Sequence, residues 1–200
     1  MSFTDPTIPV PTELRTDEFV LRPLTAADAE LDYAAVMETR VDLRLWEQST
    51  WPADDFTVED NRLDLIRHAD LHAAHRAFTY TVLDLTGTTC LGCVYLYPIT
   101  ASFLARSTVT SLDDEAWEEV DAVVYFWVRA SQAALDLDER LLATLRAWLA
   151  DIWHFQHAMY VVSERFAHQI DLLERTDLQR TFALREPGKS GTYILYGDRA

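Results

Sequence analysis

The chain has 200 residues, of which 49% are hydrophobic and 25% charged, a composition typical of one globular domain. Its 33 acidic and 17 basic residues give a net charge of −16. Because nucleic acids and anionic membranes are bound through Lys and Arg, this charge excludes both as partners. No segment has the roughly 18 consecutive apolar residues of a membrane-spanning helix, and no secretory signal is recognisable, so we expect a cytoplasmic protein.

The N-terminal half predicts an arm, a strand, two helices and a hairpin. Prolines favour extended backbone at the start of the chain, and Thr followed three residues later by Asp marks the start of each helix. Alternating apolar residues predict the strands. In chain order these elements are an extended arm over 1–13, a strand over 19–23, helices over 26–39 and 57–76, and strands over 77–84 and 88–97.

The C-terminal half alternates between strands and helices after an acidic inserted loop. In chain order it comprises the loop over 99–118, a strand over 120–128, a helix over 137–155, a strand over 158–162, a helix over 167–175, and strands over 178–184 and 192–196. Two strands joined by a helix run parallel with a right-handed crossover, whereas hairpins pair antiparallel. We therefore predict an α/β (α+β) fold, a mixed and mostly antiparallel sheet with helices on both faces, in a single domain over 14–200.

The segment Phe19-Val-Leu-Arg-Pro-Leu-Thr-Ala-Ala-Asp28, together with this order of elements, resembles the GNAT acyltransferase superfamily. The resemblance extends from about Leu14 to Tyr196 and is closest to the branch that acetylates amino termini of ribosomal proteins. It implies an N-acetyltransferase that transfers an acetyl group from acetyl-CoA to a primary amine of a small molecule or of a protein N-terminus. A homodimer is compatible with the sequence.

The resemblance also implies where acetyl-CoA lies. In the family the cofactor sits between two splayed parallel strands, here 120–128 and 158–162, and its pyrophosphate binds backbone N–H groups where the next helix begins. The pantetheine is assigned to the backbone of Tyr125, Phe126, Trp127 and Val128.

The pyrophosphate signature of the family is degenerate in this chain. Both glycine positions of the signature are aspartates, Asp136 and Asp138. Asp136 and Glu139 also have capping-box spacing, which would occupy N–H groups that a pyrophosphate needs. An alternative alignment begins the helix earlier, so that Gln132 and Ala134 form a weaker phosphate cradle. Two hypotheses follow: an acetyltransferase, or a catalytically silent binding or regulatory protein that has lost acetyl-CoA.

Acetyl transfer to an amine needs a base and a proton donor. Glu119 and Asp121 flank the start of the predicted strand 120–128 and are candidate bases, although acidic runs are usually solvated. The resemblance implies a tyrosine acid in the late helix, but that position is Leu173. Ser163, after the second splayed strand, is the candidate substitute, and helix capping is the simpler interpretation of it.

An aromatic segment after the first helix is the candidate acceptor site. Trp46 and Trp51 belong to a predicted loop over 46–52, and Tyr95 lies on a predicted strand. We expect these aromatic residues either to line a pocket or to form a minor core. If they line a pocket, Glu47 or Asp54 would hold a cationic amine.

Three histidines follow one another along the predicted helix 57–76. His68 and His72 have metal-ligand spacing, and His75 lies one turn further on. At 100° per residue they lie opposite Leu63 and Ile66, so we expect the histidines on the solvent side of the helix. No other metal-ligand pattern accompanies them, and we predict no metal cofactor.

Overall fold

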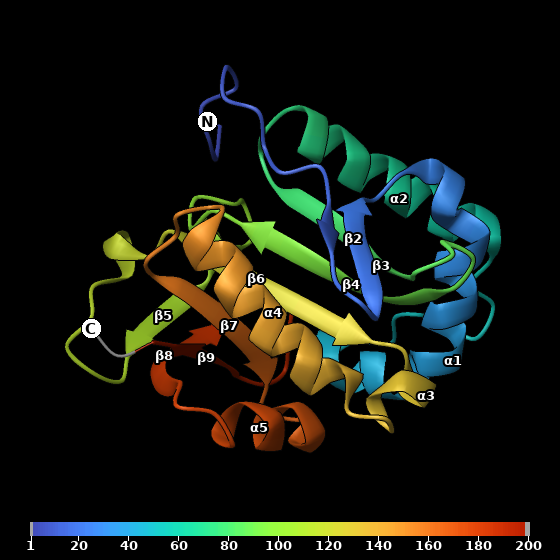
Figure 1. Ribbon diagram of the computed structural model, residues 1–200. Coiled ribbons are helices and arrows are strands. Elements are labelled where there is room, and N and C mark those ends of the chain that lie inside the picture. Colours follow the sequence, from blue (N-terminus) through green and yellow to red (C-terminus); the bar gives the residue numbers. More distant parts are fainter. Residues whose placement is uncertain (1, 199–200) are drawn as a thin grey trace.

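The computed structural model describes residues 2–198, so residue 1 of the predicted arm and residues 199–200 of the predicted domain lie outside the described part. Within residues 2–198, nine strands form one sheet in the order β1-β2-β3-β4-β6-β7-β9-β8-β5 (Figure 1). The strands are β1 Leu14–Arg15, β2 Phe19–Pro23, β3 Phe78–Asp84, β4 Cys90–Tyr97, β5 Thr108–Ser111, β6 Ala122–Val128, β7 Ala158–Ser163, β8 Gln179–Arg185 and β9 Tyr193–Gly197. The α-helices are α1 Ala29–Glu47, α2 Val58–Ala73, α3 Ala130–Ala133, α4 Leu137–Asp151 and α5 Ala167–Glu174, and short 3-10 helices span Ala26–Asp28, Leu104–Arg106 and Trp117–Glu119.

β6 and β7 are parallel neighbours, whereas the other neighbouring strands of the described sheet pair antiparallel. The chain passes from β6 through α3 and α4 to β7, which is the predicted strand–helix–strand crossover. The parallel pairing runs from Ala122 beside Ala158 to Val124 beside Tyr160. Both strands then continue without pairing to each other. The predicted mixed sheet with a central, splayed parallel pair is therefore confirmed.

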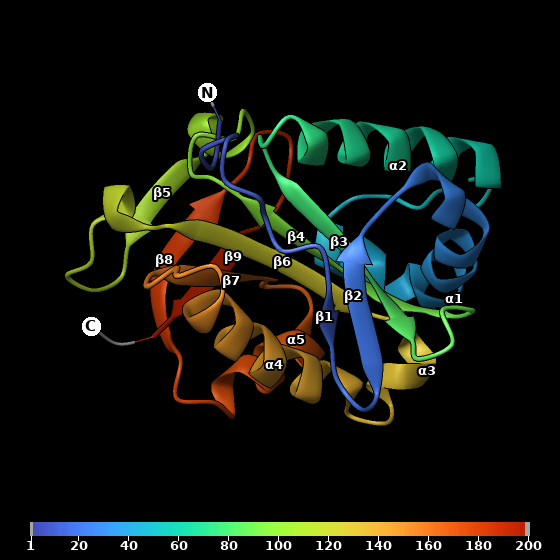
Figure 2. The same cartoon turned by 45° about the horizontal axis from the view of Figure 1, so that its top comes forward.

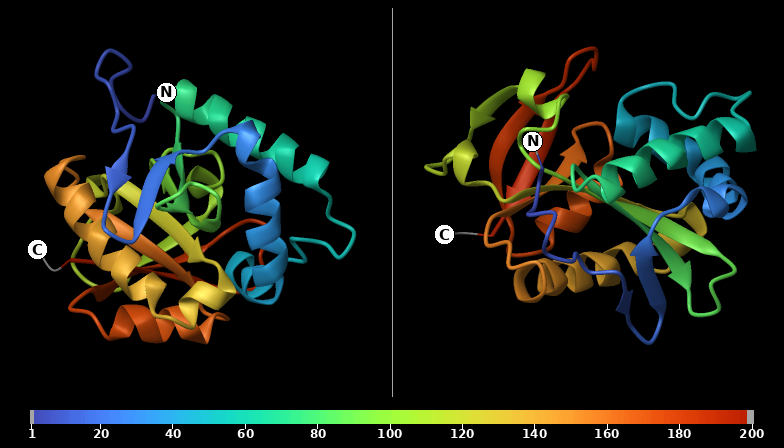
Figure 3. Two further views of the ribbon diagram at one scale, coloured as in Figure 1. Left: turned by 45° about the vertical axis from the view of Figure 1, so that its right-hand side comes forward. Right: turned by 90° about the horizontal axis from the view of Figure 1, so that it is seen from above.

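Helices cover both faces of the sheet, as predicted. α1 and α2 lie over one face, and α4 and α5 lie over the other (Figures 2 and 3). Alternate side chains of a strand point to opposite faces, so β6 contributes Val124 and Phe126 to the core beside α4, and Tyr125 and Trp127 to the core beside α1. This double covering explains the continuous apolar sequence of β6. Among residues 2–198, no helix is both long and apolar enough to cross a membrane.

Both predicted helix starts carry a capping box. Thr57 Oγ1 accepts a hydrogen bond from the N–H of Asp60, and the Asp60 carboxylate accepts one from the N–H of Thr57. At the first start, Asp28 accepts the N–H of Thr25 at 2.8 Å and two hydrogen bonds from Arg22 at 2.5 and 3.0 Å. Asp28 is therefore a buried carboxylate with a strong cationic partner.

Two local predictions were wrong. α1 is longer than predicted and includes Trp46, which the sequence placed in a loop. Leu43 and Trp46 are buried against the sheet, and this packing stabilises the helix beyond residue 39, where the sequence predicted its end. The loop 99–118, predicted as irregular, contains β5, which pairs with β8. A short, polar edge strand has no apolar alternation, so its pairing depends on a partner far along the chain.

Candidate functional site

The cleft where β6 and β7 separate is filled by the side chain of Gln169, from α5. Gln169 is 3% exposed, and its Nε2 donates a hydrogen bond of 3.0 Å to the backbone carbonyl of Phe126. Its buried Oε1 has no hydrogen-bond partner within the described residues. The remaining cavity measures about 20 Å³, enough for about one water molecule. The splay therefore exists in the backbone, but side chains close it.

The turn that follows β6 is bound by side chains of α1. The N–H of Ala130 donates to Thr39 Oγ1 at 3.0 Å, and the N–H of Ser131 donates to Glu38 Oε1 at 3.1 Å. Arg129 Nε donates to the same carboxylate at 2.6 Å. These hydrogen bonds, that from Arg129 above all, lower the pKa of Glu38 to about 2. Side chains of α1 thus occupy two N–H groups where α3 begins, a neutral hydroxyl at Ala130 and the Glu38 carboxylate at Ser131.

The start of α4 carries the two aspartates of the degenerate signature. Asp136 has a left-handed backbone (φ 57°) and makes no side-chain cap, so the predicted capping box with Glu139 does not form. An N-cap side chain reaches the third amide from extended backbone, which Asp136 lacks. Asp138 is buried. Its Oδ1 accepts the N–H of Glu139 at 3.0 Å, and its Oδ2 lies 2.6 Å from His168 Nε2.

The amides of the alternative cradle are also in use. The N–H of Gln132 donates to the carbonyl of Arg129 at 2.8 Å, and the N–H of Ala134 donates to that of Ala130 at 3.2 Å. Both bonds close the single helical turn of α3. The earlier helix start is thus present as a separate short helix, with its amides bonded inside the turn.

The three residues considered for catalysis lie in a 3-10 helix, just before β6 and at the end of β7. Asp121 Oδ2 accepts the N–H groups of Gln156 at 2.7 Å and His157 at 3.0 Å, which fixes the loop before β7. Glu119 is exposed at the end of a 3-10 helix. Ser163 is buried at the end of β7, and its Oγ accepts the N–H of Arg165 at 3.2 Å. None of the three lines the pocket described next.

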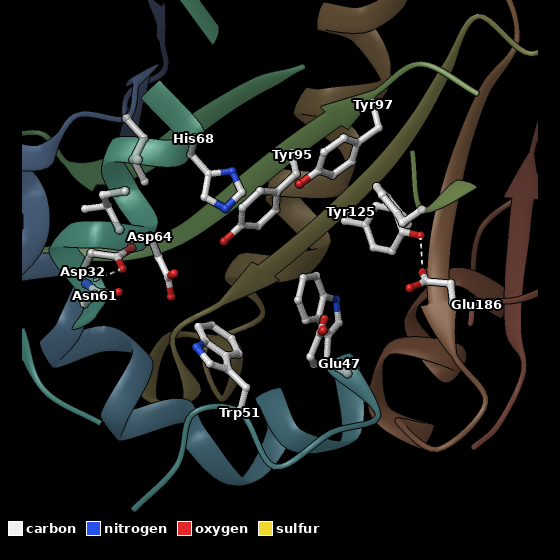
Figure 4. A pocket seen from close by; sticks show the side chains of 14 residues that line it. Asp32, Glu47, Trp51, Asn61, Asp64, His68, Tyr95, Tyr97, Tyr125 and Glu186 are labelled. Carbon is white, nitrogen blue, oxygen red and sulfur yellow. Dashed lines mark hydrogen bonds between the residues drawn. The ribbon is translucent and has the colours of Figure 1, made fainter. Parts of the chain in front are cut away.

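A pocket of about 410 Å³ lies between α1, α2, the sheet and the β8–β9 loop (Figure 4). It brings together the three residues predicted for acceptor binding, Trp46, Trp51 and Tyr95, although they come from different elements. Glu47 also lines it, whereas Asp54 instead pairs with Arg44 at 2.6 Å. The lining residues are Leu24, Asp32, Trp46, Glu47, Trp51, Asn61, Asp64, Leu65, His68, Tyr95, Tyr97, Phe103, Tyr125 and Glu186.

Aromatic rings form the middle of the pocket. The Trp46 ring lies 6.1 Å from that of Tyr95 and 6.0 Å from that of Tyr125, centroid to centroid. Tyr97 meets Tyr125 edge to face at 5.9 Å. The Tyr95 hydroxyl accepts a hydrogen bond of 3.2 Å from Trp127 Nε1, which fixes its ring. The faces of such rings attract cations.

Two carboxylates of the pocket have no basic partner in the described chain. Asp32 is 4% exposed, and its Oδ2 accepts a hydrogen bond of 3.0 Å from Asn61 Nδ2. Burial raises the pKa of Asp32 to about 6. Glu186 accepts a hydrogen bond of 2.9 Å from the Tyr125 hydroxyl, and burial raises the pKa of its carboxyl too. A cation beside either group would stabilise its ionised form.

Sequence reasoning missed these two carboxylates. Asp32 lies on the same face of its helix as the buried Ala29 and Ala35. A charged residue on an apolar face is the sequence pattern that could have identified it as a functional residue. Glu186 begins a turn-rich loop, where charged residues are ordinary, and we find no local signal for it.

The predicted orientation of α2 was wrong. Leu63 and Ile66 are 48% and 39% exposed, whereas His68 and His72 face the sheet. Polar anchors set this rotation: Asn61 Nδ2 donates to the carbonyl of Ala29 at 3.0 Å, and His68 Nδ1 lies 3.1 Å from a threonine hydroxyl of β3. Burial lowers the pKa of His68 to about 4, so its imidazole is neutral at physiological pH. Residues 2–198 contain no group of three metal-ligand side chains.

No protein-family model matches the sequence, and no curated protein sequence does either. Solved structures do match. The ribosomal-protein-S5-alanine acetyltransferase from Vibrio fischeri is 16% identical, with 94% of this chain and 96% of that chain covered and a TM-score of 0.67. A ribosomal L7/L12 alpha-N-protein acetyltransferase in complex with coenzyme A is 13% identical (91% and 94% covered, TM-score 0.67). AAC(6')-Ib in complex with ribostamycin and coenzyme A is 18% identical (91% and 93% covered, TM-score 0.62). The chain therefore has the fold of the GNAT acetyltransferases, as the resemblance in its sequence predicted.

Proposed function

We propose that the chain is a GNAT-fold protein that binds an organic cation in the pocket beside α1 and α2, and that it has lost acetyl-CoA. The observation that carries this proposal is the closed cleft between β6 and β7. Gln169 bonds the Phe126 carbonyl, on the strand assigned to pantetheine, and leaves space for about one water molecule.

The residues around the cleft do not fit acetyl-CoA. The N–H groups of Ala130 and Ser131, where α3 begins, are bonded to Thr39 and Glu38, so a pyrophosphate at Ser131 would have to displace a carboxylate held by Arg129. Asp136 and Asp138 add negative charge where α4 begins. At an effective dielectric constant near 20–40, each of these charges repels a bound phosphate by on the order of 1 kcal/mol. The two charges together weaken binding roughly ten- to a hundredfold. We therefore derive no acetyl-transfer step for this chain.

The pocket suits a cation by charge and by shape. Four carboxylates line it, and His68, which could have opposed a cation, is neutral at physiological pH. Aromatic faces supply the remaining walls, and cations bind such faces favourably. A volume of about 410 Å³ is in the range of small-molecule sites. The fold neighbour AAC(6')-Ib was solved with ribostamycin bound, which supports an amine as the ligand class.

The divergence of β6 and β7 beyond Val124 favours a second candidate function. This is an N-acetyltransferase acting from acetyl-CoA on a primary amine of a small molecule or a protein N-terminus. It requires the Gln169 side chain to leave the cleft and Glu38 to release the turn after β6. Glu119, Asp121 and Ser163 remain the candidate acid–base residues of that alternative.

Titration calorimetry with acetyl-CoA separates the two functions. For the unmodified chain we expect no binding with a Kd below about 1 mM. Gln169→Gly opens the cleft and should bind acetyl-CoA measurably more tightly than the matched surface variant Gln179→Gly. A micromolar Kd for the unmodified chain would refute the loss of acetyl-CoA. In parallel, n-hexylamine should change the fluorescence of Trp46 and Trp51, and the absence of any effect from it or from a diamine would refute cation binding.

A further inference from the structure

The pocket has a pair of carboxylates at each of its two ends (Figure 4). Asp32 and Asp64 lie at the end formed by α1 and α2, beside Asn61. Glu47 and Glu186 lie at the end formed by the α1 terminus and the β8–β9 loop. Because Asp32 and Glu47 lie several turns apart on α1 and aromatic rings lie between the two ends, one small cation contacts the carboxylates of one end and leaves the other pair without a partner.

Each pair contains one carboxylate that is already neutralised and one that is not. Asp64 pairs with Arg67, and Glu47 pairs with Lys189. Asp32 and Glu186 form no ion pair with any described residue and bond only neutral donors. Asn61 and the Cys90 thiol donate to Asp32, and the Tyr125 hydroxyl donates to Glu186. Each end therefore has one negative charge available for one ligand cation.

The end beside the β8–β9 loop is held in place before any ligand arrives. Lys189 Nζ and the Tyr193 hydroxyl donate to the carbonyl of Glu47 at 2.6 and 2.9 Å. Gln48 Nε2 donates to the carbonyl of Thr192 at 2.9 Å. These bonds tie the loop to the end of α1, so the separation between the two ends is fixed. A fixed separation selects ligands by the length between their charged groups.

The wall between the two ends suits an apolar spacer. Trp46, Tyr95 and Tyr125 present rings there, and the hydroxyls of both tyrosines are engaged, with Trp127 and Glu186. Against these three rings, a spacer rich in hydroxyl groups would lose hydrogen bonds to water. An alkyl or aromatic spacer buries apolar surface instead.

We infer that the pocket binds an organic dication, with one ammonium at Asp32, one at Glu186 and an apolar spacer against the aromatic rings. This inference rests on the proposed function, since it names the ligand class of the same cation site. A single ammonium satisfies one end only, whereas a diamine of the matching length satisfies both.

The test is a series of α,ω-diaminoalkanes from 1,4-diaminobutane to 1,12-diaminododecane, each beside the n-alkylamine with the same number of carbons. Binding is measured at pH 7.5 by calorimetry and tryptophan fluorescence. We expect one diamine length to bind at least about tenfold more tightly than its monoamine, the effect of a second partly buried ion pair. Asp32→Asn and Glu186→Gln should each reduce this ratio to within about threefold. Asp70→Asn, a surface change on α2, should leave it unchanged.

Each outcome has a defined meaning. Equal affinity for diamine and monoamine at every length would overturn the two-ended site and leave cation binding intact. Loss of the diamine preference in only one of the two pocket variants would also overturn it, because both ends must contribute. If neither amine binds at any length, the proposed function fails together with this inference.

Discussion

Replacing Asp32 by asparagine should stabilise the folded chain at neutral pH, although Asp32 is buried and hydrogen bonded. Its carboxylate is buried without a cation beside it, and burial raises its pKa to about 6 in the folded state, against an ordinary value of 3.8. Asparagine has the same shape, and its carbonyl oxygen can accept the hydrogen bond from Asn61. The substitution therefore removes a buried charge while retaining the contact that positions α2.

The magnitude follows from linkage between proton binding and folding. Between pH 3.8 and about 6 the folded state binds more protons at Asp32 than the unfolded state does, so stability falls as pH rises through this window. Above about pH 6 the full free-energy cost of the buried, ionised carboxylate is present, and the difference between the two pKa values limits this cost to about 3 kcal/mol. We expect Asp32→Asn to gain about 1–3 kcal/mol in free energy of unfolding at pH 7.5 and almost nothing at pH 4.

Urea denaturation at pH 4, 5, 6 and 7.5 measures this difference, and Asp28→Asn is the matched control. Burial pushes the pKa of Asp28 up, but hydrogen bonds from Arg22 and Thr25 outweigh burial and hold that pKa below its usual value. Asp28→Asn should therefore destabilise the chain at neutral pH, with an effect that disappears as pH falls through the lowered pKa. An Asp32→Asn variant that is less stable than the parent at every pH would refute the reasoning.

Three further outcomes are expected. Diamine affinity should fall as pH drops below about 6, by up to tenfold per pH unit, because Asp32 takes up a proton; in calorimetry Asp32→Asn should lose this contribution and keep only that of Glu186, whose pKa is also raised. Asn61→Ala should lower the free energy of unfolding by about 1–3 kcal/mol in urea melts, because it removes the hydrogen bonds to Asp32 and to the carbonyl of Ala29 at the start of α1. Retention of full stability would contradict our account of how α2 is oriented. Gly92→Ala places a Cβ 2.3 Å from the Trp127 carbonyl and should prevent stable folding, whereas Gly87→Ala, which meets nothing within 4 Å, should cost only about 1 kcal/mol; similar circular-dichroism melts would contradict this.

The elements with strong local signals were predictable from the sequence. The apolar run of β6 and the amphipathic helix after it specify a buried strand and a crossover, and the two capping boxes mark where helices begin. The rotation of α2 was not predictable in this way. Its exposed Leu63 and Ile66 suggest the opposite face, but Asn61 bonds to α1 and outweighs the apolar pattern. A helix with a weak apolar stripe is positioned by contacts that depend on the rest of the fold.

The candidate site was predictable only in part. Trp46, Trp51 and Tyr95 were singled out by residue type, and the fold brings them to one pocket. Glu186 reaches that pocket from a loop distant in sequence, so only the tertiary structure reveals it. Likewise, the substitution of signature glycines by Asp136 and Asp138 was visible in the sequence, but the closure of the cleft by Gln169 depends on how α5 packs.

The lysine content of the chain has a practical consequence. Lys189 is the single lysine of the sequence, and its side chain is 16% exposed and bonded to Glu47. If the pocket binds amines as proposed, neighbouring molecules in a concentrated sample offer almost no lysine side chain that could compete for it. Amine-reactive dyes should accordingly label the lysine side chain of the folded protein only slowly, which leaves the lining of the pocket chemically unmodified.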